Sequence, residues 1–132
     1  MAPSAAETLN KHLRELNRNI DYYDLIVTGD LGKIGSEIFL KLIQEDYNYQ
    51  PNAYMDAASV IYSDDQKETL SGGSGPVVLP LVLFNKLLVE KKYKRILLLA
   101  TGSLHNPVMV NLKKSIPSIT HAVSIEVITW FT

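Results

Sequence analysis

Three leucines near the start of the chain recur at the spacing of one helical face: Leu9, Leu13 and Leu16. This periodicity predicts an amphipathic helix. Ser4 and Glu7 match the capping box, in which a Ser hydroxyl and a Glu carboxylate accept hydrogen bonds from the free N–H groups at a helix start. We expect this helix to end near residues 17–19. The apolar run that follows, residues 23–28, predicts a short buried strand.

A turn punctuated by glycines follows this strand over residues 29–36, and helical periodicity returns over residues 37–44. The polar segment 46–56 predicts a long loop, and residues 59–62 predict a short strand. The order of helix, strand, glycine turn and helix is typical of α/β proteins with a parallel sheet.

The second half of the chain is more apolar. Residues 79–91 predict a helix with Pro80 in its first turn, because a proline deeper inside would cost about 3 kcal/mol. Residues 94–101 are almost continuously apolar, which predicts a central strand covered on both faces. A loop is expected over residues 103–117, and the alternation over residues 121–130 predicts a half-buried strand.

Composition narrows the possible functions. The chain has 132 residues, a formal net charge of −1 and no Cys, which fits one domain and excludes disulfides, thiolate metal sites and thiol nucleophiles. The near-neutral charge argues against binding nucleic acid. No secretory signal is evident, and the longest apolar run, residues 76–84, is too short to span a bilayer. We therefore expect an intracellular protein, or one that lies against a membrane through a partner.

The turn after the first strand contains a Gly32-Lys33 pair, but it does not match a nucleotide-binding motif. A phosphate-binding loop of the Walker type requires glycine at the position of Val27, and the dinucleotide pattern fails because the glycines are three residues apart. Two interpretations remain. The glycines permit a tight turn between strand and helix, or Asp30 faces a crevice at the carboxyl end of the strand, where open α/β sheets bind ligands.

A second glycine-rich segment, residues 71–75, precedes the apolar helix. It is either a plain turn or a cradle of backbone N–H groups suited to a carboxylate or phosphate. The three histidines are weaker candidates: His12, His105 and His121. A Ser103 or Thr101 nucleophile paired with His105 is conceivable, yet the Gly-x-Ser-x-Gly pattern is absent. No spacing of ligands typical of a metal site is present.

Four segments resemble, in order and spacing, the C-terminal half of the stage V sporulation protein AD (SpoVAD) family, thiolase-like proteins of spore-forming bacteria: residues 24–32, 72–75, 95–102 and 115–123. The resemblance covers nearly the whole chain. It implies a single thiolase-like half-domain over residues 1–132, with a mixed, mostly parallel sheet covered by helices and an antiparallel C-terminal strand.

The resemblance also implies a function and a site. SpoVAD binds dipicolinic acid and takes part in moving it into the developing spore. The loops that would line the pocket contain these residues: Gly29, Asp30, Gly72, Gly73, Ser74 and Gly75. Asp30 stands where condensing enzymes of the superfamily commonly have His, and the half that carries their Cys nucleophile is missing, so we expect no catalytic residues, cofactor or metal site.

This chain departs from the family pattern where residues 76–80 replace Cys and small residues, and Ala57 and Ser118 stand where Cys is common. Our leading hypothesis is a non-enzymatic protein that binds dipicolinic acid, alone or with Ca²⁺, near Ser74 and Gly75. The alternative is a structural module that self-associates or completes a split thiolase-like protein. A condensing or hydrolytic enzyme using Asp30 or His105 is the third. The partners implied are other SpoVA proteins and an N-terminal half or a second copy, in the cytoplasm or peripheral to the forespore membrane.

Overall fold

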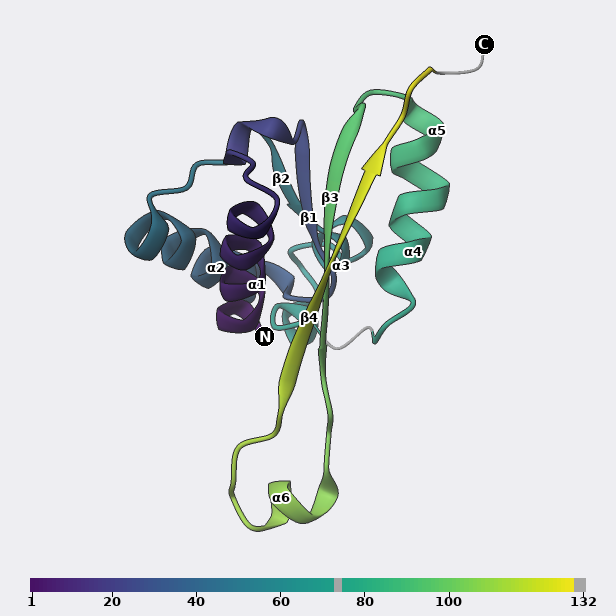
Figure 1. Cartoon of the computed structure of the whole chain (residues 1–132). Coiled ribbons are helices and arrows are strands. Elements are labelled where there is room, and N and C mark those ends of the chain that lie inside the picture. Colours follow the sequence, from purple (N-terminus) through teal and green to yellow (C-terminus); the bar gives the residue numbers. More distant parts are fainter. Residues whose placement is uncertain (73–74, 130–132) are drawn as a thin grey trace.

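The computed structural model describes residues 1–72 and 75–129, and its centre is a four-stranded sheet in the order β2-β1-β3-β4 (Figure 1). The strands are β1 (Leu25–Thr28), β2 (Tyr54–Asp56), β3 (Arg95–Ser103) and β4 (Ser118–Glu126). Both β2 and β3 pair in parallel with β1, whereas β4 pairs antiparallel with β3. The predicted mixed α/β sheet with an antiparallel C-terminal strand is therefore confirmed.

Helices cover both faces of the sheet (Figure 1). One side carries α1 (Ala2–Glu15) and α2 (Gly32–Tyr47), and the other carries the continuous run of α4 (Val78–Val82), the π turn η3 (Leu83–Leu87) and α5 (Leu88–Glu90). Because side chains alternate along a strand, Ile26 packs into the core beneath α1 and α2, while Leu25 and Val27 pack beneath α4. Both faces are thus buried along β1 and over residues 96–99 of β3, as the unbroken apolar runs predicted.

The first helix does not use the predicted capping box. It begins at Ala2, with Met1 as its N-cap and no side-chain cap. The hydroxyl of Ser4 lies 3.0 Å from the Thr120 hydroxyl, in a side-chain hydrogen bond between α1 and β4. This contact between distant parts of the chain takes the place of the local cap. The helix ends at Glu15, slightly earlier than expected, and Asn17 follows with a left-handed φ of 51°.

The segment between α2 and α4 differs most from the predictions. Residues 59–62, expected as a strand, belong mostly to the helix α3 (Ala57–Ile61), and β2 lies inside the segment expected as a loop. Asp56 explains the difference, because its side chain caps α3 by accepting a hydrogen bond from Ala58 N. The helix α2 begins at Gly32, earlier than residue 37. Two short helical turns complete the set: η1 (Ile20–Tyr22) and η2 (Lys67–Thr69).

The apolar helix begins at Val78, so Pro80 lies in its first turn as predicted, and it ends before Lys91, whose φ of 54° is left-handed. Beyond it, β3 and β4 form a long hairpin that extends away from the body (Figure 1). Its end, residues 104–117, carries α6 (Pro107–Asn111), and we call these residues the hairpin tip. The strand β4 ends at Glu126, short of the predicted residue 130, which lies outside the described residues.

Candidate functional site

A cavity of about 690 Å³ lies beyond the end of β1, beside the last residues of β3, which runs four residues past the Thr28–Leu99 pair. Its walls come from Met1, the turn after β1, the segment before α4, and the residues where β3 leads into the hairpin tip. The lining residues are Met1, Asp30, Ser71, Gly75, Pro76, Thr101, Gly102, Ser103 and His105. Open α/β sheets bind ligands at this edge, at the carboxyl ends of their strands.

Asp30 forms the centre of this wall, where only 6% of it is exposed. Its Oδ2 accepts a hydrogen bond of 3.1 Å from the main-chain N–H of Gly75, and its own N–H donates to the Thr101 hydroxyl over 3.1 Å. The preceding N–H, that of Gly29, donates to Leu99 O and continues the ladder between β1 and β3. The site is therefore built from residues of three separate segments.

Gly72 packs directly against the turn that holds Asp30. A Cβ added at Gly72 would lie 2.2 Å from the carbonyl oxygen of Asp30, and its φ of 83° is one that favours glycine. The structure thus brings together four of the six predicted site residues: Gly29, Asp30, Gly72 and Gly75. The other two, Gly73 and Ser74, lie outside the described residues.

The expected cradle of backbone N–H groups is partly occupied from within the chain, because the N–H of Gly75 donates to the Asp30 carboxylate. Four residues of the cavity lining carry side chains that can donate to a carboxylate ligand: Ser71, Thr101, Ser103 and His105. Since the Thr101 oxygen accepts from Asp30 N, its hydroxyl hydrogen can be donated elsewhere. The site can therefore donate hydrogen bonds even though its most buried charge is negative.

Asp56 was missed as part of this region, although it shapes the turn. It is 2% exposed, and its two oxygens accept hydrogen bonds from the Thr28 hydroxyl and three main-chain N–H groups, those of Leu31, Gly32 and Ala58. Burial raises the pKa of Asp56 above its ordinary value, while these hydrogen bonds oppose the rise. The sequence signal was an Asp directly before two alanines, which is typical of a helix N-cap.

The other candidate residues are separated by the fold. The imidazole Nε2 of His12 lies 2.6 Å from the hydroxyl of buried Tyr23, and His121 lines a smaller cavity of about 190 Å³ on β4. His105 makes no hydrogen bond to Thr101 or Ser103 in the part of the chain that the structure describes. The hydroxyl–histidine pair that a nucleophile requires is therefore not formed among these residues.

Two further features bear on binding. Within residues 1–72 and 75–129, no group of three or more His, Asp or Glu residues is placed to hold a metal ion. None of the helices in these residues has the length and apolar character needed to cross a membrane.

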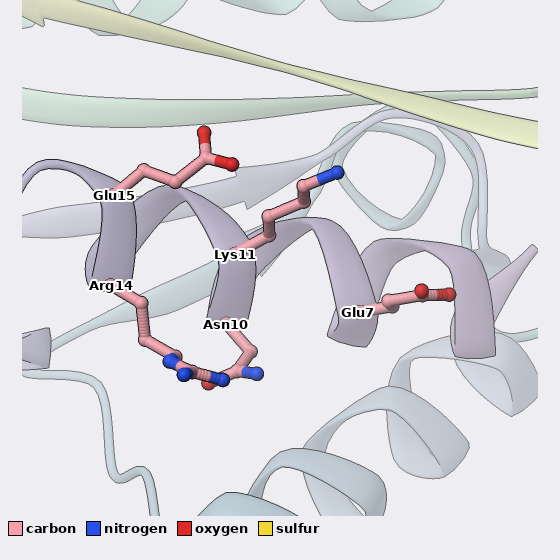
Figure 2. A pocket seen from close by; sticks show the side chains of 5 residues that line it. All are labelled: Glu7, Asn10, Lys11, Arg14 and Glu15. Carbon is pink, nitrogen blue, oxygen red and sulfur yellow. The ribbon is translucent and has the colours of Figure 1, made fainter.

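A hollow of about 520 Å³ lies over α1 (Figure 2). All its lining residues come from this one helix: Glu7, Asn10, Lys11, Arg14 and Glu15. Figure 2 shows Asn10 and Arg14 extending to one side of the helix, and Lys11 and Glu15 to the other. No strand end or loop contributes to it, so we assign the candidate site to the cavity around Asp30.

Comparison with known proteins shows the family of this chain. The family model of stage V sporulation protein AD (SpoVAD) matches residues 1–126, so the chain belongs to that family of sporulation proteins. Stage V sporulation protein AD of Bacillus subtilis (strain 168) is 40% identical over 129 residues, which cover 96% of this chain and 38% of that protein. The chain thus spans well under half of the length of this relative, as expected for a C-terminal half.

Proposed function

We propose that this chain binds dipicolinic acid in the cavity around Asp30 and contributes to its uptake into the developing spore. Membership of the SpoVAD family supports a role in sporulation, and the resemblance to that family implies the ligand. The observation that carries the proposal is the cavity of about 690 Å³ at the carboxyl ends of β1 and β3, with Asp30 and Gly75 in its wall. A small aromatic dicarboxylate suits a cavity of this size.

The charge of Asp30 determines how such a ligand binds. A carboxylate beside a second carboxylate is repelled, so the ligand turns its carboxylates toward Thr101, Ser103 and His105, or reaches Asp30 through a bridging Ca²⁺. Ca²⁺ prefers carboxylate oxygens, and dipicolinate itself supplies several of them. In this arrangement Asp30 and dipicolinate supply part of the six to eight oxygen ligands that Ca²⁺ takes, and water completes the set.

Binding rather than catalysis is the function proposed. In the described part of the chain, no hydrogen bond joins a histidine to a hydroxyl of the cavity, and Asp30 is held by the main chain of Gly75. An activated nucleophile requires a base within hydrogen-bond reach. The partners that follow from the proposal are other SpoVA proteins, met in the cytoplasm or at the surface of the forespore membrane.

Isothermal titration calorimetry of the whole chain with dipicolinate, with and without Ca²⁺, tests the proposal. We expect heat of binding that Ca²⁺ increases, and we expect Asp30→Asn to remove the effect of Ca²⁺ because it removes the charge that the ion bridges. Asp65→Asn, an exposed change, is the matched control. No heat at millimolar ligand, in either condition, refutes ligand binding by this chain.

A second function is favoured by one observation, an apolar surface on the outer side of α4 and η3. Val77, Leu81 and Phe84 recur at helical spacing there and are 59%, 47% and 63% exposed. An exposed apolar stripe of this kind promotes association. The alternative function is therefore a structural module that self-associates or completes a split thiolase-like protein.

Sedimentation velocity distinguishes self-association from completion of a split protein. Self-association predicts a mass that rises with concentration and falls to the monomer in a Leu81→Ser/Phe84→Ser variant. A monomer at high concentration that forms a complex with a separately expressed N-terminal part of the Bacillus subtilis relative supports completion. A monomer that forms no such complex contradicts the structural role.

A further inference from the structure

The outer edge of β4 lacks the features that usually protect the edge of a sheet. Within residues 1–72 and 75–129, β4 pairs with β3 alone, and the register between them runs over nine residue pairs without a bulge. The strand contains no Lys, Arg or Pro, and Glu126 at its end is its single carboxylate. Natural sheets protect an exposed edge with charges, prolines or bulges, because a bare edge pairs with another strand.

The main-chain groups of the even-numbered residues of β4 point to this outer edge. The N–H of Val127 donates to Lys94 O, so Val127 and every second residue before it bond to β3. The residues between them direct their N–H and C=O groups away from β3, as in any antiparallel ladder. Thr120 agrees with this pattern, because its carbonyl oxygen accepts a hydrogen bond from the Thr8 hydroxyl on α1. A carbonyl oxygen has two lone pairs, so that oxygen can also accept from the N–H of an added strand.

The sequence of β4 is nearly the same in both directions about Ala122, which indicates what the added strand is. Residues equally far from Ala122 match in kind: Ile119 with Ile125, and Thr120 with Ser124. Two antiparallel copies paired about Ala122 therefore place isoleucine opposite isoleucine on one face of the sheet and hydroxyl opposite hydroxyl on the other. A shift of two residues in either direction separates the isoleucines and leaves the strand ends unpaired. A strand of another sequence needs no such symmetry, whereas a twofold interface presents the same patch from both sides.

The exposed apolar side chains of β4 lie where this pairing covers them. Ile119 is 57% exposed and Val123 is 47% exposed. Both lie on the same face of the strand as Ile125, which packs against the core beneath α4. Pairing about Ala122 brings the Ile125 of a second copy opposite Ile119, and so removes apolar surface from water in both copies.

We propose that β4 pairs antiparallel with β4 of a second copy of this chain, about a twofold axis at Ala122, and joins the two sheets into one. This interface is separate from the apolar stripe on α4 and η3. The proposal holds whether or not the cavity around Asp30 binds dipicolinate, because the pairing uses the outer edge of the sheet.

Single cysteines test this pairing, because the chain contains none of its own. Ala122→Cys places two thiols directly opposite each other at a Cα separation of about 5.5 Å, which a disulfide bridges. Val123→Cys is the control, because Val123 lies opposite His121 of the second copy and about 8 Å from its own counterpart. We expect mild oxidation of the whole chain to give a covalent dimer with Ala122→Cys and mainly monomer with Val123→Cys. Random collision predicts the reverse order, since Val123 is exposed and Ala122 is half-buried. The reverse order, or no dimer from either variant, overturns the proposal.

Sedimentation equilibrium measures the dimer without a covalent link. Val123→Lys on β4 and Val89→Lys on α5 place the same charge at exposed positions, and circular dichroism checks that both variants keep the fold. We expect Val123→Lys to raise the dissociation constant of the dimer about tenfold or more, because a charge blocks the pairing of a sheet edge. Val89→Lys and the α4 variant Leu81→Ser/Phe84→Ser should leave the constant close to that of the parent. A dimer that only the α4 variant dissociates assigns self-association to the stripe on α4 and η3, and overturns pairing at β4. A parent that stays monomeric at high concentration overturns it as well.

Discussion

The carboxylate of Asp30 accepts a hydrogen bond from the main-chain N–H of Gly75, which lies 45 residues further along the chain. This bond joins the turn after β1 to the segment that leads into α4, and both line the same cavity. The Asp30 N–H is in turn held by Thr101 on β3. The wall of the candidate site is therefore a small network of polar contacts between segments that are distant in the sequence.

Thr101→Val should loosen this wall. The substitution keeps the shape of the side chain but removes the hydroxyl that accepts from Asp30 N, and a lost hydrogen bond of this type costs about 1–2 kcal/mol of unfolding free energy. Urea unfolding followed by circular dichroism measures the change. Thr101→Ser keeps the hydroxyl and should recover most of the loss, whereas equal destabilisation by both variants would mean that the methyl group matters instead.

Gly72→Ala should be more damaging than an ordinary glycine substitution. Its Cβ would meet the Asp30 carbonyl oxygen at 2.2 Å, and the left-handed φ adds about 1 kcal/mol or more of strain. Gly102→Ala is the control, because a Cβ there meets nothing within 4 Å. We expect the first variant to lower the midpoint of thermal unfolding clearly and the second to leave it nearly unchanged. Similar midpoints for the two would contradict the close packing at Gly72.

Asp56→Asn should destabilise the fold although it removes a buried charge. Asn keeps one oxygen and places an NH₂ group against backbone N–H donors that now bond to the carboxylate, so at least one is left unsatisfied at a cost of about 1–3 kcal/mol. Chemical denaturation at neutral pH measures this loss of unfolding free energy, with the exposed change Asp65→Asn as the control. A gain in stability would show that the burial cost of the charge exceeds the value of its hydrogen bonds.

Stability should fall as the solution becomes mildly acidic, and His12 should account for part of the fall. Burial, and then the charge of Arg18, lower the pKa of His12 below its ordinary 6.5. A histidine with a lowered folded-state pKa contributes stability that is present above 6.5 and is lost as the pH falls through the folded value. Between about pH 7.5 and about pH 5.5, we expect the unfolding midpoint of the parent to drop more than that of His12→Gln. An equal drop in the unfolding midpoint of the two proteins would mean that His12 does not contribute to the loss of stability.

Elements with a local sequence signal could be predicted, whereas elements that depend on long-range contacts could not. The strands β1 and β3 have unbroken apolar runs, which indicate burial on both faces without reference to any partner. The strand β2 has three residues and no such signal, while the β-branched residues after it favoured a strand where Asp56 caps a helix. Ser4 was assigned to a cap, and its hydroxyl instead bonds to Thr120 across the fold.

The candidate site, too, could be predicted only where the sequence carries a local signal. Asp30 was predicted because it follows a buried strand, and the location of ligand sites in open α/β sheets is general. That Gly72 packs on Asp30, and that Thr101 holds its N–H, depends on how two loops meet and has no local signature. Asp56 carried a capping signal, but nothing near it in the sequence indicated that its carboxylate also holds the turn at Leu31 and Gly32.

The reach of Asp56 has a consequence for the order of folding. Its bonds to Thr28, Leu31 and Gly32 span between 24 and 28 residues, so the turn that carries Asp30 cannot be completed until β2 has paired at the edge of the sheet. Contacts of such separation form after local helices, because closing the intervening chain is costly in entropy. By this rule we expect the turn to be completed after the local helices have formed. Opening of the three-residue strand β2 would release the turn and dismantle the wall from a distance, which hydrogen exchange at Leu31 and Gly32 would record.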